Sequence, residues 1–221
     1  DKGGYSLNII FTLGNHELWN FPQCRFEEIV AKYKEVLVEN GMYLLQNNII
    51  FKNDRNDLCE IDEEELISLS SKELRLRLNE ARIIHFGGLA FAGYNEEFNA
   101  NLLIYGNVIN RHQEIEETKK FEVLYHKICD TLSDKRIIVF THMPQQDWCS
   151  KFEPQSGFIY INGHTHRNYF YDDGDYRIYA DNQIGYKHIN AFLKYFYIDD
   201  DYDIFIDYDD GIYSISREQY I

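Results

Sequence analysis

Three short segments place metal-binding and titratable side chains directly after apolar runs. The segments are GNHE at 14–17, THMP at 141–144 and GHTH at 163–166. Imidazole nitrogens and the amide oxygen of Asn are ordinary metal ligands. In layered α/β proteins, ligands bind in the loops at the carboxyl ends of strands. We therefore expect these three segments to meet at one edge of a sheet and to form a metal site.

Each segment alone supports a plainer interpretation. GNHE is also a turn sequence, since Gly and Asn are common in turns. A single histidine at a strand end is more often a structural residue than a ligand, and we interpret the other four histidines in that way: His85, His112, His126 and His188. The GHTH pair is more specific, because residues two apart on an extended segment point to the same side. Together, the three segments favour a metal site.

The order GNHE, THMP and GHTHRN resembles that of the calcineurin-like metallophosphoesterase superfamily, in its bacterial type. Two further stretches, GGLAFAGYN at 87–95 and YADNQIGY at 179–186, resemble connecting strands of such proteins. The similarity extends to about residue 187. It implies a four-layer α/β/β/α sandwich and the hydrolysis of a phosphomonoester or phosphodiester by a hydroxide that two divalent metal ions activate.

The resemblance also implies roles for individual residues. Asn15, His142 and His164 match ligands of one metal ion, and His166 matches a ligand of the other. His16 matches the family's catalytic histidine, which contacts phosphate oxygen and helps the leaving group depart. Manganese, iron and zinc all suit nitrogen and oxygen ligands.

Glu17 has two equally weighted interpretations. Its carboxylate either orients His16 from behind or lies at the start of a helix, exposed to solvent. Trp19 and Trp148 each follow one of the motifs closely, and either wall a substrate pocket or pack in the core.

The chain departs from the family pattern before Gly14. The family begins with an Asp-x-His and then a Gly-Asp strand end, and the 13 residues that precede Gly14 contain neither. The missing motifs would supply the Asp that bridges the two metal ions, and the Asp and His that complete the first metal site. Three explanations remain: an N-terminal segment outside these residues completes the site, a second chain completes it, or the protein is an inactive truncated relative with a binding or regulatory role.

The amino-acid composition indicates which kind of protein this is and which partners are disfavoured. The 221 residues are 44% hydrophobic, which is typical of a globular domain. The net charge of −15 disfavours long nucleic acid and anionic lipid, so we expect a small phosphorylated substrate. No apolar run is long enough to span a membrane. The four cysteines form no C-x-x-C pair, which favours free thiols and a cytoplasmic location.

The hydrophobic pattern predicts one α/β (α+β) domain over residues 1–221. Residues 7–13 are expected to form a strand buried on both faces, and residues 82–95 to form paired strands. A C-terminal antiparallel meander is predicted over 192–216. The remaining predicted elements are helices at 26–41, 71–81 and 110–133, and strands within 42–53, 135–144, 156–166 and 176–185.

Overall fold

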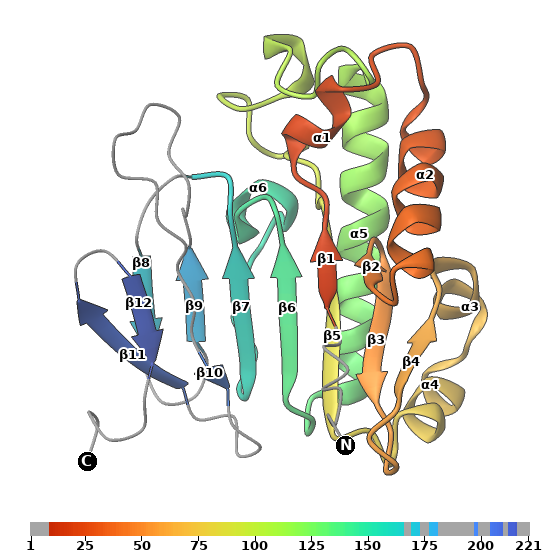
Figure 1. Ribbon diagram of the computed structural model, residues 1–221, viewed down its shortest axis with the longest axis vertical. Helices are drawn as coiled ribbons and strands as arrows, with labels where there is room; N and C mark the ends of the chain where they lie inside the picture. The colour runs from red at the N-terminus through yellow and green to blue at the C-terminus, as the bar shows by residue number, and fades with distance from the viewer. Residues whose placement is uncertain are drawn as a thin grey trace, which may run out of the picture.

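The computed structural model in Figure 1 describes residues 9–165 in full and, beyond them, the backbone of five strands. Its centre is a seven-stranded mixed sheet in the order β4-β3-β5-β6-β7-β9-β8. The strands of this sheet are β3 (Asn48–Lys52), β4 (Leu58–Ile61), β5 (Ile83–Gly88), β6 (Ile137–Thr141), β7 (Phe158–Asn162), β8 (Tyr169–Asp172) and β9 (Arg177–Ala180).

The strands that carry the motifs run in one direction. β5, β6, β7 and β9 pair in parallel, whereas β3, β4 and β8 run antiparallel to their neighbours. The parallel strands therefore end at the same edge of the sheet, at the top of Figure 1. Helices pack against this mixed sheet, which confirms the α/β class.

A separate pair of parallel strands holds the first motif. β1 (Ile10–Thr12) pairs in register with β2 (Tyr43–Leu45). We expected this first strand to be buried on both faces, and that prediction was wrong, because Phe11 is 43% exposed. Among the described residues β1 pairs only with β2, and the side chain of Phe11 lies on a partly exposed face of β1.

Two long helices begin where the sequence places them. α2 (Phe26–Glu39) is followed by Gly41 at φ +69°, a backbone conformation that favours glycine. α5 (Arg111–Leu132) begins after Asn110, whose side chain accepts from the amide of Gln113. The shorter helices are α1 (Asn15–Trp19), α3 (Glu63–Ser68), α4 (Ser71–Arg77), α6 (Gln145–Trp148) and the 3₁₀ helix η1 (Ala100–Leu102).

The buried face of α5 packs on the central sheet. The ring of Phe121 stacks on Phe86 of β5 at a centroid distance of 4.9 Å. The hydroxyls of Tyr125 and Tyr160, the latter on β7, lie 2.8 Å apart in the core. The hydrogen bond between these hydroxyls satisfies polar groups that would otherwise be buried without partners. This helix thus supports the strands that lead to the second and third motifs.

The segment from 82 to 95 forms one strand and a loop rather than paired strands, so that prediction was wrong in part. β5 ends at Gly88, and the following loop binds α5 through Thr118, whose hydroxyl donates to Phe91 O and accepts from Gly93 N. These groups therefore use a helix side chain in place of a second strand. Only glycine fits at position 87, because a Cβ there would lie 1.8 Å from the carbonyl oxygen of Phe140.

Three strands pair antiparallel within residues 192–216, in the order β10-β11-β12. Their bounds are β10 (Tyr197–Ile198), β11 (Ile204–Asp209) and β12 (Ile212–Ile215). Among the helices that the structure describes, none is both long enough and apolar enough to cross a bilayer.

Candidate metal centre

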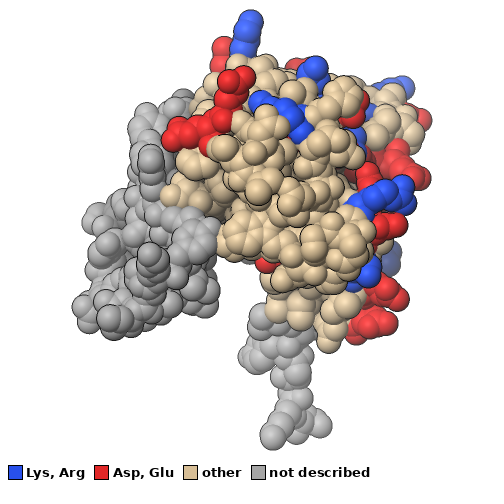
Figure 2. Space-filling view, turned by 90° about the horizontal axis from the view of Figure 1, so that it is seen from above, with Lys and Arg blue, Asp and Glu red and all other residues tan. Residues whose placement is uncertain are grey.

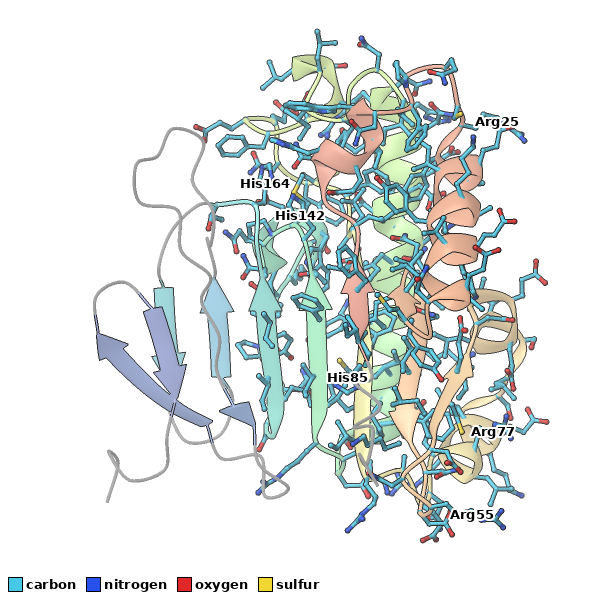
Figure 3. All side chains as sticks on the ribbon, viewed as in Figure 1. Arg25, Arg55, Arg77, His85, His142 and His164 are labelled. Atoms are coloured by element: carbon cyan, nitrogen blue, oxygen red, sulfur yellow. The ribbon has the colours of Figure 1, made fainter. Side chains whose placement is uncertain are left out.

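The structure brings together side chains from all three motif segments. Figure 3 shows His142 and His164 beside one another above the carboxyl ends of β6 and β7. Their ring centroids lie 5.2 Å apart. Asn15 approaches from α1, and its Oδ1 lies 2.9 Å from Nε2 of His142. Thus three of the four predicted ligands meet at one edge of the sheet.

Asn15 is held in a defined orientation. Its side chain is buried, and its Nδ2 donates a hydrogen bond of 2.8 Å to the carbonyl of Ile104. The amide oxygen therefore faces His142. Because that oxygen only accepts hydrogen bonds, Nε2 of His142 carries the proton in the 2.9 Å contact.

The position of His142 follows from the parallel ladder of the sheet. Its amide donates to Gly88 O at the end of β5, and its carbonyl accepts from the amide of Gly163 at the end of β7. These bonds continue the β5-β6-β7 pairing by one residue beyond the strands. Two glycines leave room for the imidazole: a Cβ on Gly14 would lie 3.1 Å from Nδ1 of His142, and one on Gly163 would lie 3.5 Å from it.

His164 adopts an unusual backbone conformation. Its φ is +62°, in the left-handed region that few residues other than Gly occupy, although His, like Asn and Asp, is found there more often than most. Such strain is found preferentially at functional sites. The turn is closed by a 2.7 Å bond from Thr165 N to Gly163 O, and Phe98 contacts the imidazole edge-on at a centroid distance of 5.6 Å.

His16 lies next to this group, on α1. Its ring stacks on Trp19 with centroids 4.0 Å apart and an angle of 21° between the planes. Trp19 is fixed in turn by a 2.8 Å bond from its Nε1 to Ile104 O. Glu17 acts at the start of the same helix. Its Oε2 accepts a hydrogen bond of 2.7 Å from Gly14 N and so caps the start of α1.

A buried ion pair supports the loops above the site. Glu114 is fully buried; its Oε2 accepts from Arg111 at 2.7 Å and from Ala100 N at 2.9 Å. The same guanidinium donates to the carbonyls of Ala92 and Gly93. Removing one partner of such a buried pair is costly, because the other charge is left uncompensated. The pair therefore fixes both the loop after β5 and the segment that leads to Ile104.

A buried carboxylic acid supports the loop after His142. Asp147 on α6 accepts from Asn95 Nδ2 at 2.9 Å, and its carbonyl accepts from Tyr94 N. Burial raises the pKa of Asp147 above its ordinary value, although the bond from Asn95 opposes this. The segment that follows the second motif is thereby attached to the loop after β5.

The other residues that the sequence singled out are one candidate ligand, His166, and two tryptophans. His166 lies outside the described residues. Trp148 is fully buried and belongs to the core, whereas Trp19 is 45% exposed beside His16 and is suited to a pocket wall. Sequence reasoning missed Phe98 and the carbonyl of Ile104. The only signal for either was its place in the long connection between β5 and α5.

The donor set of this site suits a divalent metal ion. It offers one neutral oxygen and two imidazole rings, a combination that manganese, iron and zinc all accept. The two candidate ligand atoms, Asn15 Oδ1 and His142 Nε2, already lie 2.9 Å apart. Because all three ligands are neutral, we expect them alone to bind a dication weakly. Comparison of the chain with protein-family models, with curated proteins and with solved structures yields no match.

Proposed function

We propose that Asn15, His142 and His164 hold a divalent metal ion, with His166 as a ligand of a second ion, and that the protein hydrolyses phosphoesters. The observation that carries this proposal is the 2.9 Å approach of Asn15 Oδ1 to His142 Nε2, with the His164 ring 5.2 Å from that of His142. The three side chains come from the three segments that resemble the calcineurin-like metallophosphoesterases.

Metal ions at such sites supply Lewis acidity toward phosphoryl oxygens and a nucleophile at neutral pH. The protein's own residues supply orientation and protons. His16 is suited to donate a proton to the leaving oxygen. Its stacking on Trp19 restricts the rotation of the ring, so the imidazole stays at the site edge.

The surroundings of the site favour a small substrate with an apolar or aromatic leaving group. Figure 2 looks down on this edge of the sheet, where much of the surface between the charged side chains is uncharged. Exposed apolar side chains lie near the site: Trp19 beside His16 and Phe98 against His164. The net charge of −15 disfavours a long polyanion.

The four-layer sandwich belongs to the same proposal. β1 and β2 are separate from the main sheet, and α2 packs on β2, as expected for the start of a second sheet with its own helical layer. The missing carboxylate ligands would come from an N-terminal segment or from a second chain. The alternative function is a binding or regulatory protein that keeps the fold without catalysis.

The test combines metal binding with turnover. Mn²⁺ binding is measured by electron paramagnetic resonance, and turnover with p-nitrophenyl phosphate and bis(p-nitrophenyl) phosphate. The assays use the chain alone and the chain preceded by any segment that its gene encodes upstream. We expect His142→Ala to abolish both signals, and His112→Ala, an exposed histidine on α5, to preserve them.

The outcomes separate the two candidate functions. Mn²⁺ binding that depends on His142, without turnover of either substrate, would favour the binding or regulatory role. Equal Mn²⁺ binding by wild type and His142→Ala would overturn the metal site itself.

A further inference from the structure

A second cluster of metal-binding side chains lies between α5 and the segment after α6. Glu122 and His126 are four residues apart on α5, so they share one face of the helix. Cys149 follows α6 directly. One ligand atom from each of the three residues lies within 4.8 Å of the other two. The cluster shares no residue with the site formed by Asn15, His142 and His164.

The three side chains form a partly buried cluster rather than a fully exposed one. Cys149 is 3% exposed, and the side chain of Glu122 is 13% exposed, whereas that of His126 is 51% exposed. Cys149 and Glu122 therefore lie on the buried side of the cluster, and the imidazole of His126 lies on its solvent-exposed side. A cation could reach this site from solvent past His126 without any movement of the core.

Hydrogen bonds already orient the carboxylate. Oε2 of Glu122 accepts from the hydroxyl of Tyr94 at 2.5 Å, and Oε1 accepts from the amide and hydroxyl of Ser150, both at 2.7 Å. A carboxylate has about four lone-pair sites, and the Cys149 thiol also hydrogen-bonds to this carboxylate, so a metal ion that replaces the thiol proton would find one position there. Supporting bonds of this kind orient ligands in metal sites.

The cluster offers a dication two anionic ligands, the Glu122 carboxylate and the Cys149 thiolate. Burial and the neighbouring Glu122, opposed by a backbone hydrogen bond from Lys151, together raise the pKa of the Cys149 thiol to about 11, so a metal ion would have to displace the thiol proton. Once bound, it would neutralise both the thiolate and the carboxylate. The distance between His126 Nε2 and Glu122 Oε1 is 3.8 Å, which is too long for a hydrogen bond, so the imidazole is not hydrogen-bonded to this carboxylate oxygen.

We propose that Glu122, His126 and Cys149 bind one thiophilic divalent cation, of the zinc class. Cysteine, histidine and glutamate are all zinc ligands, and a water would complete four-coordination at the exposed side. The bound ion would connect α5 to the segment that follows His142, since α6 begins three residues after it. Its role is that of a structural clamp on the second motif.

Cobalt(II) provides the direct test, because a cobalt–thiolate bond gives an intense near-ultraviolet charge-transfer absorption. The site at Asn15, His142 and His164 contains no cysteine and cannot produce this signal. We expect the reduced 221-residue chain to develop the absorption on addition of Co²⁺, with one equivalent bound, and to lose it on addition of Zn²⁺. Cys149→Ala should abolish the signal, and His126→Ala should weaken binding at least about tenfold.

Two matched variants complete the design. Cys129→Ala removes another buried thiol from α5, and His112→Ala removes the histidine of a different i,i+4 pair, His112–Glu116, which has no thiol nearby. Both should keep the absorption. His126 is half exposed, so loss of signal in His126→Ala with an unchanged unfolding midpoint is not a folding defect. The proposal is overturned if wild type shows no charge-transfer band, or if the band persists in Cys149→Ala or at full affinity in His126→Ala.

Discussion

Nε2 of His142 lies 2.9 Å from Oδ1 of Asn15, although 127 residues separate them in the chain. The two atoms that form this hydrogen bond are the same two that would bind a metal ion. A proton and a metal therefore compete for Nε2. This relationship makes the amide oxygen of Asn15 the most informative atom to alter.

Replacing Asn15 tests the contribution of that oxygen. Asn15→Ala removes one of three ligands, and we expect Mn²⁺ affinity to fall at least about tenfold. Asn15→Asp adds a negative charge to an otherwise neutral ligand set, so Mn²⁺ affinity should rise. Titration calorimetry provides the measurement. Equal affinities for Asn15→Ala and wild type would exclude Asn15 as a ligand.

Gly14 and Gly163 form a natural pair of variants around the imidazole of His142. A Cβ on Gly14 would lie 2.9 Å from Cε1 of His142, which forces the ring to move. A Cβ on Gly163 makes only an ordinary contact at 3.5 Å. We expect Gly14→Ala to abolish Mn²⁺ binding, and Gly163→Ala to retain most of it. The opposite order would show that the ring orientation differs from the one described.

Glu17 is expected to stabilise α1 through its bond to Gly14 N. Glu17→Ala should lower the free energy of unfolding by about 1 kcal/mol, which is typical of losing a helix-capping interaction. Glu17→Gln keeps an accepting oxygen and should lose much less. Urea unfolding measures both. If Glu17→Gln instead abolishes turnover while stability is kept, the carboxylate acts on His16.

His85 predicts a pH dependence of stability. Desolvation within β5 lowers the pKa of its imidazole from 6.5 to about 4, and the bond to Ile50 O opposes this only in part. The folded state thus binds fewer protons, so this contribution is fully present above pH 6.5 and is lost as the pH falls toward 4. Between pH 7 and pH 5 wild type should lose about 2 kcal/mol more than His85→Gln. If urea unfolding shows that wild type and His85→Gln lose the same stability between pH 7 and pH 5, the lowered pKa of His85 would be refuted.

Trp19 is expected to position His16 through ring stacking. Trp19→Ala should reduce kcat/KM for p-nitrophenyl phosphate at least about tenfold, because the imidazole gains rotational freedom. Trp19→Phe keeps a stacking surface and should recover most of the loss, although it cannot donate to Ile104 O. If Trp19→Ala and Trp19→Phe lower kcat/KM equally, the loss would be assigned to the indole N–H rather than to ring stacking.

The strands that lead to His142 and His164, and helix α5, were predictable from local pattern, whereas α1, which carries Asn15, was not predicted as a helix. The apolar runs of β6 and β7 and the amphipathic repeat of α5 are long, and Asn110 marks the start of α5 as a capping residue. Phe11 could not be placed correctly, because its exposure depends on what packs on that face of β1 and not on its own segment. Tertiary context decided that case.

The loop after β5 shows a second limit of sequence reasoning. Its small apolar residues are compatible with a strand, but Gly93 binds Thr118, 25 residues away on α5. Ile104 is a similar case, because an isoleucine side chain does not predict which groups its backbone carbonyl will bind. Contacts made by the backbone leave almost no trace in residue identity, which is why this support for the site was not foreseen.

The carbonyl of Ile104 accepts from both Asn15 Nδ2 and Trp19 Nε1, each at 2.8 Å. The candidate ligand Asn15 and the exposed ring of Trp19 are thus held by one carbonyl, 89 residues from Asn15 in the chain. An insertion or deletion near residue 104 would displace the two together. Under the proposed function, a change in this connection would alter metal binding and substrate contacts together.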